Sequence, residues 1–113
     1  MHELSLMEAV RDLALEQARL HGASRIAAIT LRIGSLAGVE PEALRFAHDV
    51  VMAGTAAAGA RLQIDDVPAR FWCEACQQPF EAEQGDGFCP RCGACSCGLL
   101  QGRELELASL ELC

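Results

Sequence analysis

The sequence predicts an α+β fold, with a small mixed sheet of about three strands, two helices on one face, and an inserted cysteine-rich module. Two segments carry apolar residues at helical spacing, and three carry the alternation of a half-buried strand. Two Cys-x-x-Cys pairs precede the last of these strands. We therefore expect a discontinuous α/β domain at 1–69 and 101–113, interrupted by a metal-binding domain at 70–100.

The first helix is predicted over 5–20. Its apolar residues recur at a spacing of three and four, namely Leu6, Val10, Leu13, Ala14 and Ala18. Ser5 and Glu8 form a capping-box pattern, and Gly22 is the expected residue just past the end. We interpret His21, in the last turn, as a capping residue rather than a metal ligand.

A strand is predicted over 25–34, because Ile29, Leu31 and Ile33 alternate with polar residues. The glycine-punctuated segment 34–38 follows it. This segment lacks the Lys-Ser/Thr that completes a phosphate-binding loop, so we expect a plain turn.

The second helix is predicted to begin at Pro41 and to end near Gly54. Its apolar stripe is Leu44, Ala47 and Val51. We interpret the single histidine within it, His48, as a packing or surface residue. A second strand over 62–67 ends at Pro68, and a last strand over 104–112 needs a bulge at Ala108-Ser109 to keep its leucines on one face.

The two cysteine pairs carry the strongest chemical signal. Cys73 and Cys76 form one pair, Cys89 and Cys92 the other, and twelve residues lie between the pairs. Each pair can form a tight turn that presents two thiolates, which together complete the tetrahedral set that Zn²⁺ prefers. The intervening polar stretch offers little apolar surface, and neither pair has a thioredoxin-like context. The sequence thus predicts a structural zinc ribbon that is disordered without metal.

Composition limits the other functions. The 113 residues suffice for one modest core with an appendage, and the net charge of −7 argues against phosphate contacts to nucleic acid. Seven cysteines, an odd number, favour metal in a reducing compartment over a disulfide framework. Without a leader or an apolar run of membrane-spanning length, we expect a cytoplasmic protein that does not bind membranes.

The chain opens with Met1-His2-Glu3. A histidine at the second position can chelate a metal through the terminal amine, its own backbone amide and its imidazole, a nitrogen set that suits Ni(II) or Cu(II). The alternative is a frayed terminus in which His2 has no role.

Taken together, the opening Met1-His2-Glu3-Leu4, the strand 31–34, both cysteine pairs and the segments 102–105 and 109–111 resemble the HypA/HybF family of nickel metallochaperones of [NiFe]-hydrogenase maturation. The resemblance covers essentially the whole chain. It implies a protein, not an enzyme, that receives Ni²⁺ at its amino terminus and delivers it to the hydrogenase large-subunit precursor. Implied partners are the GTPase HypB and, in some members, urease accessory proteins.

The resemblance also implies residue roles. The nickel ligands are the Met1 amine and His2, with Glu3 contributing its backbone or carboxylate, and Glu40 supports the site. The zinc ligands are Cys73, Cys76, Cys89 and Cys92. The chain departs from the family at Cys95 and Cys97, which could exchange with a ligand, and ends in Cys113, an expected free thiol.

Two other classes remain open. One is a zinc ribbon that binds nucleic acid or another protein. Binding to nucleic acid needs a basic stripe, yet Arg91 is the only basic residue between Cys73 and Cys97. A thiol redox switch would use Cys92 with Cys95, or Cys95 with Cys97, and would hold no stoichiometric zinc. A hydrolase is disfavoured, because no nucleophile is paired with a base.

Overall fold

The computed structural model describes residues 2–82, 86–96 and 98–113. In chain order the elements are α1 (Glu3–Leu20), β1 (Ile26–Gly34), α2 (Pro41–Met52), β2 (Arg61–Val67), β3 (Arg70–Cys73), β4 (Gln78–Glu81), β5 (Gly98–Gln101) and β6 (Leu105–Leu112). The contacts divide the chain into two compact units. The helical unit comprises 1–31, 38–65 and 106–113, and the cysteine unit comprises 32–37 and 66–105.

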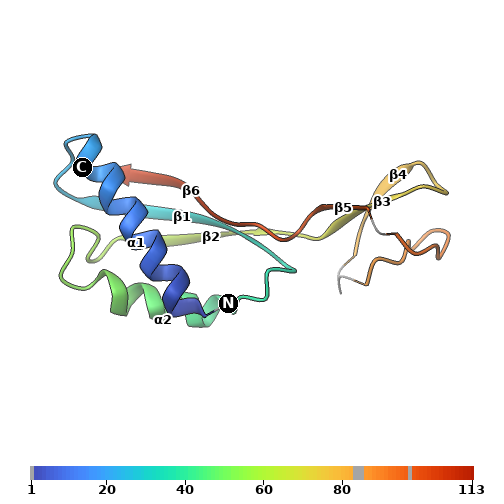
Figure 1. The fold of residues 1–113 in the computed structure, drawn as a ribbon, viewed down its shortest axis with the longest axis horizontal. Helices are drawn as coiled ribbons and strands as arrows, with labels where there is room; N and C mark the ends of the chain where they lie inside the picture. Colours follow the sequence, from blue (N-terminus) through green and yellow to red (C-terminus); the bar gives the residue numbers. More distant parts are fainter. Residues whose placement is uncertain (1, 83–85, 97) are drawn as a thin grey trace. The chain divides into compact units, whose positions relative to one another are not determined.

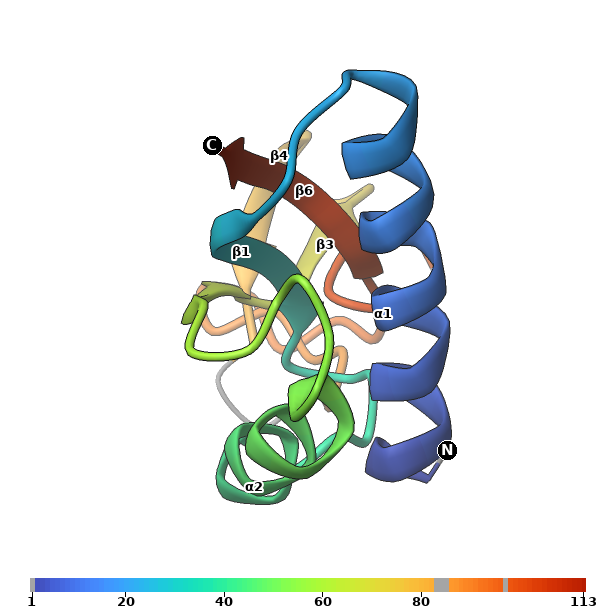
Figure 2. The ribbon, with the colours of Figure 1, turned by 90° about the vertical axis from the view of Figure 1, so that its left-hand side faces the viewer.

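The first sheet has the strand order β2-β1-β6 and is mixed, as predicted. Strands β1 and β6 run antiparallel, because Gly34 pairs with Glu104 at one end while Arg25 pairs with Cys113 at the other. Strands β1 and β2 run parallel, because the Ser35 N–H donates to the Val67 carbonyl where both strands end. Figure 2 shows α1 and α2 on one side of this sheet.

An aliphatic core fills the space between the helices and β1. Each element supplies buried residues, comprising Met7, Val10, Ala14 and Ala18 from α1, Leu44, Ala47, Val51 and Met52 from α2, and Ile26, Ala28, Ile29 and Leu31 from β1. The predicted stripe of the second helix is confirmed. In the first helix Leu13 was a wrong assignment, since it is 57% exposed, whereas Met7 is fully buried.

The start of α1 also differs from the prediction. The helix begins at Glu3 with His2 as N-cap, so Ser5 lies inside the first turn and makes no capping box. Glu3, the first residue of the helix, accepts a hydrogen bond from the Glu40 N–H at the start of α2, a tertiary contact that the local pattern does not contain. The other end agrees with the prediction: Gly22 has φ +66°, and the Nδ1 of His21 lies 2.8 Å from the Gln17 carbonyl oxygen.

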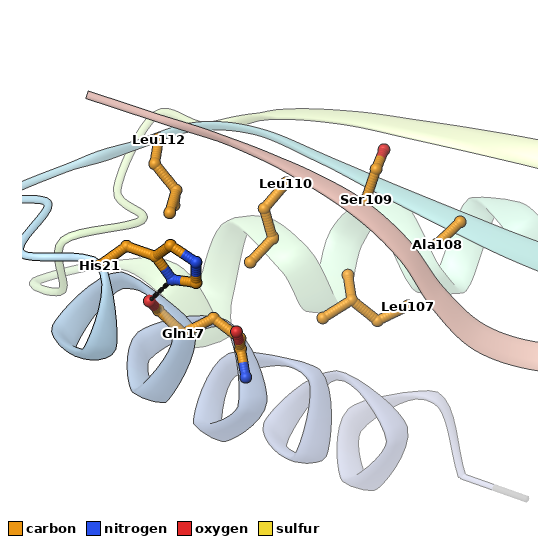
Figure 3. A pocket seen from close by; sticks show the side chains of 7 residues that line it. All are labelled: Gln17, His21, Leu107, Ala108, Ser109, Leu110 and Leu112. Carbon is orange, nitrogen blue, oxygen red and sulfur yellow. Dashed lines mark hydrogen bonds between the residues drawn. The ribbon is translucent and has the colours of Figure 1, made fainter.

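The last strand confirms the expected break in alternation. Along β6 the leucines at 105, 107, 110 and 112 are half-buried, and two successive exposed residues, Ala108 and Ser109, separate the two pairs. Figure 3 shows Leu107, Leu110 and Leu112 directed toward α1, while Ser109 points away. The extra residue thus keeps the leucines on one face.

The cysteine unit contains a second sheet that periodicity did not reveal, with strand order β4-β3-β5 (Figure 1). Its small core includes Phe71 and Phe80, whose rings stack with centroids 5.7 Å apart. The expectation that the stretch after Cys76 would bury little apolar surface was therefore wrong, since Phe80 is only 4% exposed. Four-residue strands are too short to give a clear alternation.

Candidate metal centre

The first cysteine pair lies at a hairpin. Cys73 ends β3 and pairs with Gln78, the first residue of β4. The Cys76 N–H donates to the Cys73 Sγ at 3.4 Å, which closes the turn. Gln77 follows with φ 53°, a left-handed conformation that reverses the chain into β4. Its side-chain amide donates to the Glu74 carbonyl at 2.7 Å and so stabilises that conformation.

The second pair repeats this turn without flanking strands. The Gly93 N–H donates to the Cys89 carbonyl at 2.8 Å, and the Cys89 N–H donates to the Ala94 carbonyl at 2.9 Å. Gly93 has φ +76°, so a left-handed residue follows Cys92 just as one follows Cys76. The left-handed region favours glycine, which explains the residue at this position.

The two turns bring four sulfur atoms together. The Sγ atoms of Cys73, Cys76, Cys89 and Cys92 all lie within 4.8 Å of one another, and those of Cys73 and Cys92 are 3.6 Å apart. Four thiolates at about 2.3 Å from a tetrahedral zinc lie about 3.8 Å from each other. The geometry and the all-sulfur donor set therefore fit Zn²⁺.

Two thiols of this cluster have pKa values shifted in opposite directions. Burial opposes ionisation of Cys89, but the N–H groups of Cys92 and Arg91, together with the side chains of Cys92 and Cys73, outweigh it and lower the pKa of Cys89 to about 6. For Cys92 the Ala94 N–H favours the thiolate, yet contacts with Cys73, Cys76 and Cys89, together with burial, raise the pKa to about 11. A metal ion that binds all four sulfurs therefore has to displace protons from the cluster.

The additional cysteines are placed differently. Cys95 is exposed and is not one of the four clustered sulfurs. It lines a pocket of about 240 Å³ together with Trp72, Cys73 and Ser96. Cys97 lies outside the described residues. Cys113 is an exposed free thiol, as expected.

The predicted nickel residues lie at the start of α1. Met1 is outside the described residues. His2 is exposed with extended backbone angles, and its carbonyl accepts from the Leu6 N–H at 3.0 Å. Because His2 is the N-cap, its own N–H precedes the hydrogen-bonded ladder of the helix.

Glu3 connects this terminus to α2. Its Oε2 accepts from the Glu40 N–H at 3.2 Å. This bond, followed by that to its own N–H, lowers the pKa of the Glu3 carboxyl below its usual value. Glu40 is the N-cap of α2 and makes no side-chain cap of its own. The structure thus brings Glu3 and Glu40 together through the Glu40 backbone, which no local pattern could have revealed.

Two other features of the helical unit do not form a second metal centre. His48 is a buried packing residue, 4% exposed, whose Nε2 has no partner among the described residues. A cleft of about 480 Å³ between α1 and β6 is lined by leucines, Gln17 and His21 (Figure 3). The His21 Nδ1 there lies 2.8 Å from the Gln17 carbonyl oxygen. Within the described residues, no helix is long and apolar enough to span a membrane.

Comparison with known proteins agrees with this arrangement. Residues 1–112 match the family model described as "Hydrogenase/urease nickel incorporation, metallochaperone, hypA". The chain is 44% identical over 112 residues to hydrogenase maturation factor HypA of Acidithiobacillus ferrooxidans (strain ATCC 53993 / BNL-5-31), with 99% of each chain covered. It is 41% identical over 111 residues to hydrogenase maturation factor HybF of Klebsiella pneumoniae, with 98% of each covered.

Solved structures show the same fold. The solution structure of the Ni metallochaperone HypA from Helicobacter pylori has a TM-score of 0.69 at 26% identity, covering 99% of this chain and 97% of that one. A second HypA solution structure has a TM-score of 0.72 at 25% identity, with 100% and 97% covered. The family model covers nearly every residue, and its members are metallochaperones and maturation factors rather than enzymes. The chain therefore belongs to the HypA family of nickel metallochaperones for hydrogenase and urease nickel incorporation.

Proposed function

We propose that this protein binds Ni²⁺ at its amino terminus and delivers it to the [NiFe]-hydrogenase large-subunit precursor. The ligands are the Met1 amine and the His2 amide and imidazole, with Glu3 beside them. The observation that supports this site most directly is the exposed N-cap position of His2, whose N–H is free of the helix ladder. A terminal site with few ligands also permits release, because protons compete with nickel for its nitrogens as the pH falls.

In this proposal the zinc is structural. Cys73, Cys76, Cys89 and Cys92 fill its four positions, and a closed thiolate set leaves no open position for cargo. The zinc then stabilises two turns in a unit whose own core is small. The protein works in the cytoplasm, where thiols stay reduced.

The decisive experiment is a Ni²⁺ titration of the reduced, zinc-loaded protein, comparing wild type with His2→Ala. His21→Ala is the matched control, since it removes an exposed imidazole from the other end of α1. We expect His2→Ala to weaken nickel binding by at least about tenfold, and His21→Ala to leave it unchanged. Zinc content should stay at one ion per chain in all three proteins.

Other results point to other functions. If nickel binding survives His2→Ala, the terminal site is wrong and the protein is a zinc-stabilised interaction module. If the purified protein holds no zinc and has a reactive low-pKa thiol, it is a redox switch.

Delivery requires a separate assay. Nickel-loaded protein is mixed with purified large-subunit precursor, with or without the GTPase HypB, and nickel is measured in the re-isolated precursor. We expect transfer, and faster transfer with the GTPase and GTP. The absence of transfer in both cases would rule out direct delivery, and the same assay with urease accessory proteins tests the second proposed destination.

A further inference from the structure

A hydrogen bond between distant parts of the helical unit links the amino end of α1 to the start of α2. Glu3 is the first residue of α1, and Glu40 immediately precedes α2. Their bond, from the Glu40 N–H to the Glu3 Oε2, spans 3.2 Å across a sequence separation of 37 residues. A first helical turn without such a partner frays easily, because its N–H groups have no acceptors within the helix.

The electrostatics of this bond favour the carboxylate. Glu3 lies at the amino end of α2, where the helix dipole presents a partial positive charge. Glu40 provides no side-chain cap at this position. The carboxylate from α1 accepts from the N–H of Glu40 itself, which is the bond that the third-residue glutamate makes in a capping box. Glu40 thus contributes a backbone donor, while its own side chain is exposed.

We propose that Glu3 is a positioning residue whose carboxylate fastens the nickel-binding terminus to the Glu40 N–H at the start of α2. This inference rests on the proposed nickel site. It assigns Glu3 a structural partner in place of direct ligation by its carboxylate, and it assigns Glu40 a role through its backbone rather than its side chain. The fastened turn fixes the position of His2 and reduces the ordering that chelation requires.

The chain allows the backbone donor to be removed alone. Glu40→Ala deletes the carboxylate and keeps the N–H, whereas Glu40→Pro deletes both. Glu40 has φ −89° and ψ 118°, an extended conformation, so proline at this position requires a rotation of φ by about 25° toward about −65°. At position 3, Glu3→Ala removes the acceptor, and Glu3→Gln restores an uncharged one.

The test measures Ni²⁺ affinity, the ligand-field absorption spectrum of bound nickel, and hydrogen exchange of the residue-40 amide in all variants except Glu40→Pro. We expect Glu40→Ala to match wild type, and Glu40→Pro and Glu3→Ala to bind nickel about five- to tenfold more weakly. Glu3→Ala should also speed exchange at Glu40, and Glu3→Gln should recover part of both losses. The spectrum should stay the same in every variant, because the ligands are unchanged.

Two results would overturn the proposal. If Glu40→Ala weakens binding as much as Glu40→Pro, the Glu40 carboxylate is the contributing group. If Glu3→Gln changes the nickel spectrum, the Glu3 carboxylate is itself a ligand. His2→Ala in the same series tests the proposed function separately, since retained nickel binding there would refute the terminal site whatever the variants at 3 and 40 do.

Discussion

At the scale of single residues, two cysteines of one Cys-x-x-Cys motif differ in whether they belong to the sulfur cluster. Cys92 lies three residues before Cys95, and both are exposed, yet only Cys92 belongs to the four sulfurs within 4.8 Å. The turn closed by Gly93 directs the chain so that Cys92 remains at the cluster and Cys95 continues to the pocket beside Trp72.

This placement predicts a difference between two serine variants. Cys92→Ser should lose tightly bound zinc, because a hydroxyl is a poor replacement for a thiolate ligand, whereas Cys95→Ser should retain one zinc ion per chain. Metal analysis after gel filtration measures both. Equal zinc loss in the two variants would mean that Cys95 exchanges with Cys92 as a ligand.

Gly34 is a second residue of interest, because the close approach of another backbone segment leaves no room for a side chain there. A Cβ built there would lie 2.1 Å from the backbone of Gly102, which cannot move aside. By contrast, a Cβ at Gly98 meets the Trp72 Cβ at 3.5 Å, an ordinary contact. The glycine loop after β1 is thus a packing contact within the cysteine unit, where the Ser35 Oγ also accepts from the Ala69 N–H at 3.1 Å.

We therefore predict that Gly34→Ala destabilises the protein by about 3 kcal/mol, as overpacking against rigid backbone does. Gly98→Ala should change the stability by less than about 0.5 kcal/mol. Thermal unfolding of the zinc-loaded proteins compares them. A Gly34→Ala protein as stable as wild type would mean that the backbones separate at little cost.

At the scale of elements, β3 and β4 stabilise the first cysteine turn. Phe71 on β3 and Phe80 on β4 are opposite partners, and their stacked rings lie in the small core that also includes Cys73 and Cys89. The two aromatic side chains therefore support the cysteine ligands by packing in the same core.

Phe80→Ala should destabilise the cysteine unit by about 3 to 4 kcal/mol and weaken zinc retention against a chelator. Phe88→Ala is the control in the same unit, because Phe88 is 54% exposed and should be replaceable at little cost. The rate of zinc transfer to a coloured chelator reports both variants. Equal rates would show that the metal alone maintains the turns.

At the scale of the whole molecule, the two units carry separate spectroscopic reporters. Both helices lie in the helical unit, and the single tryptophan, Trp72, lies in the cysteine unit. Removal of zinc can therefore be followed in each unit independently.

We predict that chelation of zinc changes the fluorescence of Trp72 and exposes the backbone amides of the cysteine unit to hydrogen exchange. Most of the helical circular dichroism should remain. We expect this because the core of the cysteine unit is small and a metal ion would supply much of its folding free energy, whereas the helical unit has an aliphatic core of its own. Refolding on zinc addition is the control. Simultaneous loss of the helical signal would show that the two units unfold as one.

Local chemistry allowed much of this protein to be predicted. Helical and alternating periodicity located both helices and the first sheet within a few residues, because each of these elements buries one continuous stripe. The spacing of Cys73, Cys76, Cys89 and Cys92 identified the four sulfurs that the structure brings together, since a Cys-x-x-Cys turn forms from neighbours in the chain. The terminal histidine was also visible in the sequence, although its role in nickel binding stays a proposal.

Only the tertiary structure decided the contacts between distant residues. It placed the Glu3 carboxylate at the Glu40 N–H, paired Gly34 with Gly102, built the sheet of β3, β4 and β5 around Phe71 and Phe80, and separated Cys95 from the cluster. None of these leaves a periodic trace in the sequence, because each depends on where the chain returns after a long interval. The sequence by itself therefore determined the two helices, the strands of the first sheet and the four sulfur donors, and the packing between remote segments determined how those atoms are held.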